Sequence, residues 1–265
     1  TKHGIDRALG AKLLRPFCRR PITLIYGVLG ITAFFSMWIS NTATTAMMLA
    51  IIAPLLRDVP AGDAFHRGVI LAVPFGANIG GMATPIGTPP NAVALAALRD
   101  AGIEMGFVDW MIIAAPLSAV LLAVVGLSLF FFFRPSVDLT LTPPKRPVAI
   151  AAKGRWTLII LGLAILFWLT GKWHGINAAV VALMAAAALT ALGVLDKRDV
   201  DSIDWNILIL MWGGLSLGNA MIETELVDYL VQLPIADLSG VWLAIAIVVL
   251  SVALSTFMSN TAAAN

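Results

Sequence analysis

A long run without any charged residue constrains this chain most. Between residues 110 and 133 the sequence contains no Asp, Glu, Lys or Arg. About 20 apolar residues in a helix are enough to cross the hydrocarbon core of a bilayer. Similar runs recur along the chain, in which 60% of the residues are hydrophobic and 12% charged, well below the share of charged residues in soluble domains. We therefore predict an all-α polytopic membrane protein.

Several classes of function are excluded by what the sequence lacks. The net charge is only +2, and no basic stripe interleaved with aromatic residues is present, so we expect no nucleic-acid partner. The single cysteine, Cys18, excludes an intrachain disulfide and an all-cysteine metal site. The chain has no HExxH motif and no pair of aspartates in an apolar run, so we expect neither an enzyme nor a bound cofactor.

One apolar run is interrupted by helix-breaking residues. Residues 76–91 read Gly-Ala-Asn-Ile-Gly-Gly-Met-Ala-Thr-Pro-Ile-Gly-Thr-Pro-Pro-Asn. Glycine and proline are the weakest helix formers, so this stretch predicts two half-helices in place of one continuous crossing. Irregular backbone at membrane depth is tolerated only where it is buried in protein or lines a wet cavity. A functional site is therefore expected here.

The apolar runs divide the chain into predicted segments. These are a cytoplasmic interfacial helix at 1–20, a first repeat at 21–133, a cytoplasmic linker at 134–155 and a second repeat at 156–265. The first repeat comprises a re-entrant hairpin at 21–56, a broken helix at 66–99 and a spanning helix at 107–133. We expect the chain to be a fragment of a longer protein that stops inside the second hairpin.

The distribution of basic residues agrees with this topology. With a hairpin that returns at residues 40–42 and a broken helix that crosses once, only Arg99 and Lys172 lie on the outer side. The other 15 of the 17 Lys and Arg residues are then cytoplasmic, as the excess of positive charge in short cytoplasmic loops predicts.

A motif repeats within the chain. Ser36-x-x-x-Ser40-Asn41-Thr42-Ala43 recurs 219 positions later as Ser255-x-x-x-Ser259-Asn260-Thr261-Ala262. Each copy follows an apolar run, and the predicted topology makes the first hairpin enter from the cytoplasm and the second from outside. The halves are therefore expected to be inverted repeats, the layout of many secondary transporters with broken helices and a site near the midplane.

These motifs carry a family resemblance. The paired Ser-Asn-Thr turns, the first extended to Ser-Asn-Thr-Ala-Thr-Thr-Ala-Met-Met, and Ile-Gly-Thr-Pro-Pro-Asn at 86–91 resemble the divalent-anion/sodium symporter family over essentially the whole chain. The resemblance implies a multi-pass protein of the plasma (inner) membrane that couples sodium to the uptake of a divalent anion, most simply a C4-dicarboxylate. It further implies a homodimer that works by an elevator-like movement.

The resemblance also implies a set of binding residues. One sodium ion would be held by Ser36, Ser40, Asn41 and Gly87, and a second by Ser255, Met258 and Asn260. The interiors of the apolar runs contain no charged residue, so the anion must be held by neutral donors, the partial positive charge of half-helix N-termini and bound sodium. The expected anion-binding residues are Asn41, Thr42, Thr88, Pro89, Asn260 and Thr261.

Simpler interpretations of the same residues stay open at this point. Ser and Asn in the two turns could merely cap a hairpin, and Gly80, Gly81 and Gly87 could merely allow helices to pack closely. A carrier for sulfate or another oxyanion, an anion exchanger, a channel or a non-transporting anion sensor would use similar groups. Inverted repeats favour a carrier over the last two.

Overall fold

The computed structural model describes residues 5–60, 62–134, 152–203, 205–226 and 240–257, together with residue 260. All regular structure within these ranges is helical, without a strand, which confirms the predicted all-α class. The chain forms two compact units. The first comprises Thr1–Thr88 and Glu104–Lys197, and the second Pro89–Ile103 and Arg198–Asn265.

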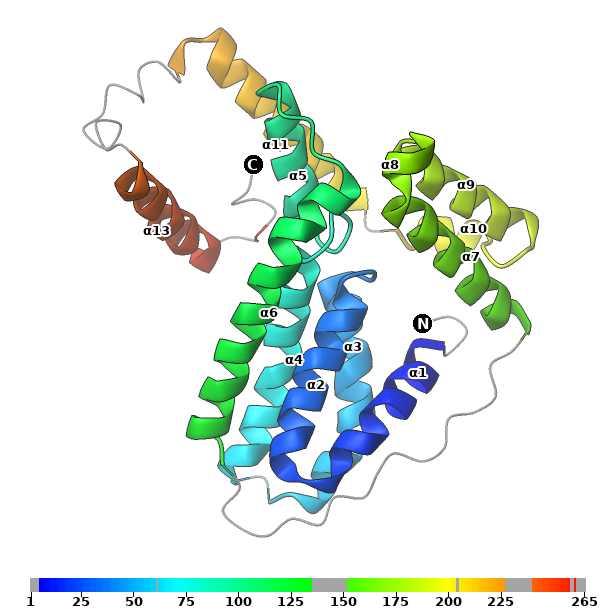
Figure 1. Ribbon diagram of the computed structural model, residues 1–265, viewed down its shortest axis with the longest axis vertical. Helices are drawn as coiled ribbons and strands as arrows, with labels where there is room; N and C mark the ends of the chain where they lie inside the picture. The colour runs from blue at the N-terminus through cyan, green and yellow to red at the C-terminus, as the bar shows by residue number, and fades with distance from the viewer. Residues whose placement is uncertain are drawn as a thin grey trace. The chain divides into compact units, whose positions relative to one another are not determined.

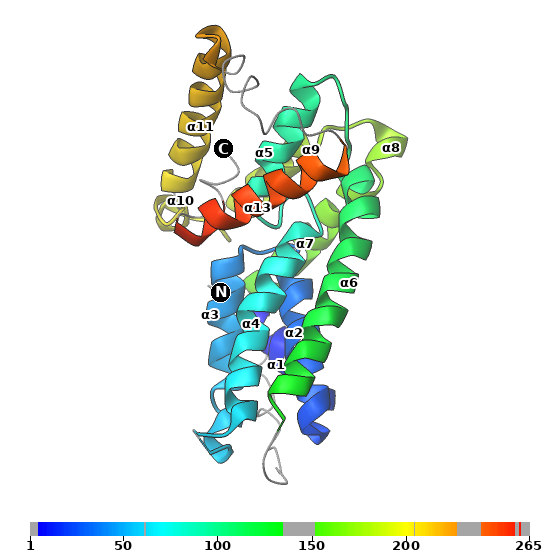
Figure 2. The same cartoon turned by 90° about the vertical axis from the view of Figure 1, so that its left-hand side faces the viewer.

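The first unit is built around a group of helices that run alongside one another (Figures 1 and 2). Its α-helices are α1 (Ile5–Leu14), α2 (Pro21–Ser36), α3 (Asn41–Ile52), α4 (Ala64–Met82), α6 (Phe107–Phe132), α7 (Ala152–Leu169), α8 (Gly171–His174) and α9 (Ala178–Ala191). Short 3-10 helices follow α1 at Arg15–Arg19 and α3 at Leu55–Asp58. The most extensive pairing is between α2 and α4.

A helical hairpin places the first Ser-Asn-Thr motif at its turn. Helix α2 begins at Pro21, whose fixed φ suits the first position of a helix. The chain turns after Ser36, and α3 begins at Asn41. Ser40 is the N-cap of α3, because its Oγ accepts a hydrogen bond from the backbone N–H of Ala43 at 3.4 Å. Whether the hairpin is re-entrant in a membrane stays a prediction.

The break in the Gly- and Pro-rich run is shorter than the sequence predicted. Helix α4 continues through Gly76, Gly80 and Gly81 to Met82, and α5 (Pro89–Asp100) begins after an interruption at residues 83–88. The expectation that the glycines of this stretch cannot sustain a helix was wrong for Gly76, Gly80 and Gly81. A glycine costs a helix about 1 kcal/mol relative to alanine, which packing against a neighbouring helix can offset.

Close packing of α4 against α2 explains why these glycines stay helical. A Cβ added at Gly76 would lie 2.6 Å from the carbonyl oxygen of Leu29, and one added at Gly80 would overlap the backbone of Ala33. Both neighbours belong to α2. The two helix backbones therefore approach so closely that only glycine fits between them, as in many membrane helix pairs.

Helix α6 is the element best suited to cross a membrane. Among the described residues it is the one helix long and apolar enough by itself, and only 17% of its most apolar window is buried. Ile112 and Phe132 are 64% and 79% exposed. A core helix of a soluble protein would be largely buried, so this apolar surface suits a lipid environment. Shorter apolar helices are α2, α3, α9 and α13 (Val241–Phe257).

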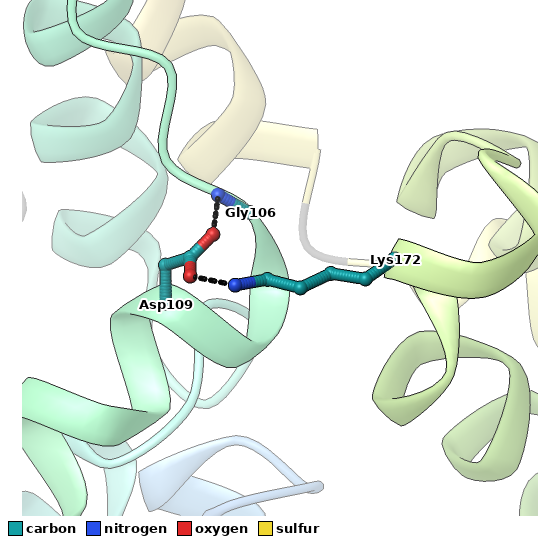
Figure 3. A network of polar contacts seen from close by, with 3 residues as sticks. All are labelled: Gly106, Asp109 and Lys172. Carbon is teal, nitrogen blue, oxygen red and sulfur yellow. Dashed lines mark hydrogen bonds and ion pairs between the residues drawn. The ribbon is translucent and has the colours of Figure 1, made fainter.

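An ion pair joins the start of α6 to α8 (Figure 3). Asp109 accepts a hydrogen bond from the backbone N–H of Gly106 at 3.1 Å, and its other oxygen lies 2.5 Å from Nζ of Lys172. Both side chains are exposed, so solvent screens the pair strongly. The predicted topology places both residues on the outer side of the membrane.

The predicted linker at 134–155 extends too far at its C-terminal end. Residues 135–151 lie outside the described part of the chain, but α7 already begins at Ala152. Lys153 and Arg155 therefore belong to the first turns of this helix, and Nζ of Lys153 donates a hydrogen bond to the carbonyl oxygen of Gly193 at 2.8 Å. Lys153 and Arg155 were assigned to the linker because they are charged and precede the apolar run. Charged residues, however, do not prevent a helix from starting.

The second unit contains α5, α11 (Trp205–Glu223) and α13, and α10 (Lys197–Asp201) begins at the boundary between the units. Residues 227–239 lie between α11 and α13, outside the described part of the chain. Most described side chains of α13 are exposed, including Trp242 and Phe257. Helix α13 therefore presents apolar side chains on its surface, as expected for a helix that contacts lipid.

The predicted topology can be tested by cysteine labelling without removing the native cysteine. Cys18 is 3% exposed, and burial raises the pKa of its thiol, so it should not react with an impermeant maleimide. Cysteine at Glu223, an exposed residue at the end of α11, should be labelled from outside intact cells. Cysteine at Lys197, before α11, should be labelled only after the membrane is permeabilised. External labelling at position 197 would overturn the inverted topology.

Candidate functional site

A chain of side-chain hydrogen bonds connects the hairpin turn to α4. The hydroxyl of Ser36, at the end of α2, donates to Oδ1 of Asn41 at 2.8 Å. Nδ2 of Asn41 in turn donates to Oδ1 of Asn78 at 3.1 Å. Ser36 is completely buried, Asn41 is half-buried and Asn78 is exposed. Three neutral polar side chains therefore meet where the two helices of the hairpin join and α4 nears its end.

The helix break lies directly against this turn. The Thr84 hydroxyl donates to the carbonyl oxygen of Met37 at 2.5 Å, and Thr84 is completely buried. Cβ atoms added at Gly81 and Gly87 would overlap Oδ1 of Asn41 and the carbonyl oxygen of Gly81, respectively. The absence of side chains at these glycines thus lets the break approach the Asn41 amide.

The structure brings together most of the first predicted sodium-binding set. Ser36 and Asn41 are hydrogen-bonded, and buried Gly87 packs on Gly81, next to Asn41. Ser40 is exposed and caps α3, so the simpler capping interpretation holds for its hydroxyl. Gly80 abuts α2, so the packing interpretation holds for that glycine.

The predicted anion-binding residues of the first half lie at two helix starts. Asn41 and the exposed Thr42 are the first two residues of α3, and half-buried Thr88 directly precedes Pro89, the first residue of α5. The hairpin was expected to return at residues 40–42, and α3 already begins at Asn41. The first backbone N–H groups of a helix have no intrahelical partner and carry partial positive charge. Each start therefore offers donors to an anion.

The second motif repeats the hydrogen bond of the first. The hydroxyl of Ser255, in α13, donates to Oδ1 of Asn260 at 3.1 Å, and the two residues are five positions apart, as are Ser36 and Asn41. Met258, Ser259 and Thr261 lie outside the described residues. The two copies thus share one local contact as well as a sequence.

Two residues of this region were not singled out from the sequence. Both belong to the stretch at 76–91 in which a site was expected. Neither was assigned a role, because a single amide or hydroxyl in such a stretch forms no pattern. What identifies both is contact across the fold: Asn78 reaches Asn41, and Thr84 reaches Met37.

Three stacked aromatic rings support the turn from one side. Trp38, in the turn, stacks on Phe107 at the start of α6, with ring centroids 6.4 Å apart and planes inclined by 13°. Phe107 stacks on Trp168 of α7 at 5.4 Å and 9°. The Trp168 indole N–H donates to the carbonyl oxygen of Ala178 at 3.0 Å. The turn is therefore braced against both α6 and α7.

The chemistry of this region favours a hard cation over a transition metal. It presents hydroxyl, carboxamide and backbone carbonyl oxygens, which are ligands for hard cations. Across the described ranges, no group of three or more His, Cys, Asp or Glu residues could hold a metal ion. Transition metals prefer such imidazole, thiolate or carboxylate ligands.

Residues 1–265 match the citrate transporter family, CitMHS, along their whole length. The chain belongs to this family. Members of this family are membrane transporters. This confirms the expectation that the chain is not an enzyme, and it confirms the resemblance to anion/sodium symporters.

Characterised relatives transport different anions. The sodium-dependent dicarboxylate transporter SdcS of Staphylococcus saprophyticus is 26% identical over 91% of the chain, and the low-affinity phosphate transporter PHO90 of Saccharomyces cerevisiae is 27% identical over 92%. An uncharacterized transporter of Methanocaldococcus jannaschii is 29% identical over 98%. The chain spans 54%, 28% and 60% of these proteins, respectively, so it corresponds to only part of each.

Proposed function

We propose that this member of the citrate transporter family forms the core of a secondary carrier that couples sodium to the uptake of a divalent anion, most simply a C4-dicarboxylate. The observation that carries the proposal is the repeated Ser–Asn contact, between Ser36 and Asn41 and between Ser255 and Asn260. In both copies a hydroxyl and a carboxamide oxygen are held within one small cation's reach. The sodium dependence named for SdcS supports sodium as the cation.

The first sodium ion would bind at the hairpin turn of the first half. Its proposed ligands are the side-chain oxygens of Ser36 and Asn41 and the backbone near Gly87 and Ser40. Ser36 is completely buried, so an ion here would lose much of its water and need protein oxygens in exchange. Neutral oxygens suit a monovalent cation, which must leave again on the other side of the membrane.

The second half would contribute an equivalent set. Ser255, Asn260 and the carbonyl of Met258 are the proposed ligands of a second sodium ion, and Asn260 and Thr261 would also donate to the anion. Under this proposal the halves are inverted repeats. From the family resemblance we further propose that the protein is a homodimer in the plasma membrane. Its transport step would be an elevator-like movement.

The anion would be held without a basic side chain. Asn41 and Thr42 at the start of α3, and Thr88 and Pro89 at the start of α5, would supply hydroxyl, amide and backbone N–H groups. Bound sodium would supply positive charge. Because a dianion among neutral donors is poorly stabilised, its affinity should rise with each bound cation, and by linkage it should tighten sodium equally.

An inorganic phosphate carrier is a second candidate. PHO90 and the inorganic phosphate transporter PHO87 of Saccharomyces cerevisiae, which is 25% identical over the whole chain, support it. Phosphate and a dicarboxylate both present anionic oxygens to hydroxyl and N–H donors, so this region suits either.

Uptake into proteoliposomes tests the proposal. The full-length protein should accumulate radiolabelled succinate when a sodium gradient is imposed, with saturation, and not when choline replaces sodium. Unlabelled citrate, phosphate and sulfate should be added as competitors, and preloaded anion would reveal exchange. Phosphate uptake that succinate does not inhibit would establish the phosphate carrier instead. Flux that neither saturates nor follows the sodium gradient would indicate a channel and contradict the proposal.

Replacing Thr88 by valine should weaken the binding of divalent anions. The substitution keeps the shape and removes one hydroxyl donor. Leaving a charged partner short of a hydrogen bond costs about 1–3 kcal/mol, or about 5- to 150-fold in affinity. The loss should persist at saturating sodium when the KM for succinate is measured. Thr45→Val, in the body of α3, is the matched control. An unchanged KM in Thr88→Val would show that the Gly-Thr-Pro-Pro-Asn motif only interrupts the helix and that Thr88 does not bind the anion.

A further inference from the structure

We propose that Asn78 is a positioning residue that orients the Asn41 carboxamide, so that its oxygen and not its amino group is presented beside Ser36. The proposal rests on the function proposed above, in which the Asn41 oxygen binds sodium. It adds a residue of α4 that neither the repeated motif nor the Gly-Thr-Pro-Pro-Asn segment contains. The observation behind it is the hydrogen bond from Asn41 Nδ2 to Asn78 Oδ1 at 3.1 Å.

Orientation matters because the two ends of a carboxamide have nearly the same shape and opposite polarity. The oxygen of Asn41 can bind a cation, whereas its NH₂ group carries partial positive charge and only donates. A half-turn about the last side-chain bond exchanges them. The cation site therefore needs a contact that distinguishes oxygen from nitrogen.

Ser36 alone does not make this distinction. Its hydroxyl donates to Asn41 Oδ1 at 2.8 Å, but a hydroxyl can equally accept from an amino group after rotating its hydrogen. Asn78 lies on the opposite end of the amide, and its oxygen accepts from Asn41 Nδ2. With both contacts in place, the donor end of Asn41 is used on α4 and the acceptor end faces Ser36.

The surroundings limit how far the Asn41 amide can move. Gly81 lies three residues after Asn78 on α4, where a Cβ would overlap Asn41 Oδ1 and lie 3.2 Å and 3.3 Å from Asn41 Cγ and Nδ2. The carboxamide therefore rests against a bare stretch of α4 backbone. It can turn in place, but it has little room to move away, so the hydrogen bond that Asn78 Oδ1 accepts from Asn41 Nδ2 favours the amino end on α4 and the oxygen beside Ser36.

Substitutions at Asn78 separate positioning from packing. Asn78→Leu keeps the size and removes the acceptor, so the sodium concentration for half-maximal effect should rise about fivefold or more. Asn78→Asp keeps an acceptor and no longer has a donor, so it should preserve the Asn41 orientation and bind sodium at least as tightly as the wild type. The added negative charge should weaken succinate binding at the same time. Asn177→Leu is the control, because it removes an amide that caps α9 and belongs to neither repeated motif.

Two measurements on the purified full-length protein are needed. Sodium-dependent thermal stabilisation without substrate reports cation binding directly, and succinate uptake in proteoliposomes over a range of sodium concentrations reports coupling. For Asn78→Leu, uptake should recover toward the wild-type maximum at saturating sodium. If Asn78 only holds the hairpin on α4, the maximal uptake rate of Asn78→Leu should be lower and should not recover at saturating sodium. Its melting temperature should then be lowered without sodium as much as with it.

The outcomes distinguish this inference from the proposed function. If wild-type protein shows sodium-driven uptake and sodium stabilisation, and Asn78→Leu has the same half-maximal sodium concentration, Asn78 does not position Asn41. A rise in that concentration equal for Asn78→Leu and Asn78→Asp also overturns the inference. If the wild type responds to sodium in neither measurement, the proposed sodium coupling fails, and the role of Asn78 fails with it.

Discussion

Sodium-driven uptake should be abolished when either Asn41 or Asn260 is replaced by alanine. Each substitution removes a proposed sodium oxygen and the partner of a serine hydroxyl, Ser36 or Ser255. In Asn41→Ala the Ser36 hydroxyl would stay buried without its acceptor, which costs about 1–3 kcal/mol. The loss of a cation ligand adds to this. We expect uptake to fall to the level of empty liposomes, measured as labelled succinate under a sodium gradient.

The control for this prediction is Asn177→Ala. Its amide oxygen accepts from the backbone N–H of Ala179 at 2.8 Å, so the substitution also removes an asparagine hydrogen bond, but far along the chain from either motif. It should lower stability slightly and leave uptake near the wild-type level. Membrane insertion should be intact in all three variants. Wild-type uptake in Asn41→Ala or Asn260→Ala would contradict the assignment of that motif to a sodium site.

The second large effect is expected at Gly80. Alanine at this position would place its Cβ against the backbone of Ala33 in α2, and backbone cannot move aside as a flexible side chain can. Overpacking of this kind costs about 1–3 kcal/mol or more. The α2–α4 pair should separate slightly, which would also move the turn that carries Asn41. We expect a lower melting temperature in detergent and strongly reduced uptake.

Gly30→Ala is the matched control for this effect. Gly30 lies in the body of α2 like its neighbours, and a Cβ there would meet nothing within 4 Å. Alanine is favoured over glycine inside a helix by about 1 kcal/mol, so this variant should melt at the same or a higher temperature. Equal melting temperatures for Gly80→Ala and wild type would show that the two helices are not as closely packed as described.

Much of the architecture follows from the sequence because it depends on local physics. The apolar run at 110–133 predicted a spanning helix, and α6 covers Phe107–Phe132. The Ser-Asn-Thr motif predicted a turn, and Ser40 caps the helix that follows it. Apolar length and N-capping preference depend on neighbouring residues alone, so both are visible without a structure.

Helix boundaries were less predictable where tertiary contacts outweigh local preference. Gly76 and Gly80 oppose a helix by themselves, yet α4 runs through them because α2 packs where their side chains would be. The start of α7 at Ala152 is a smaller case, in which a charged first turn is accepted within a helix. Intrinsic propensity is a weak predictor, since packing energies at such points are as large as the propensity differences.

The sequence by itself determined the class of the protein, its family and the two Ser-Asn-Thr motifs, because composition, hydrophobic runs and a repeated motif are properties of residues near one another in the chain. Only the tertiary structure decided which distant groups meet at the first motif. Asn41 and Asn78 are 37 positions apart, and Thr84 and Met37 are 47 apart. These contacts depend on how α2 and α4 pack. A local sequence pattern does not indicate which residue a carboxamide or hydroxyl will contact once the two helices lie side by side.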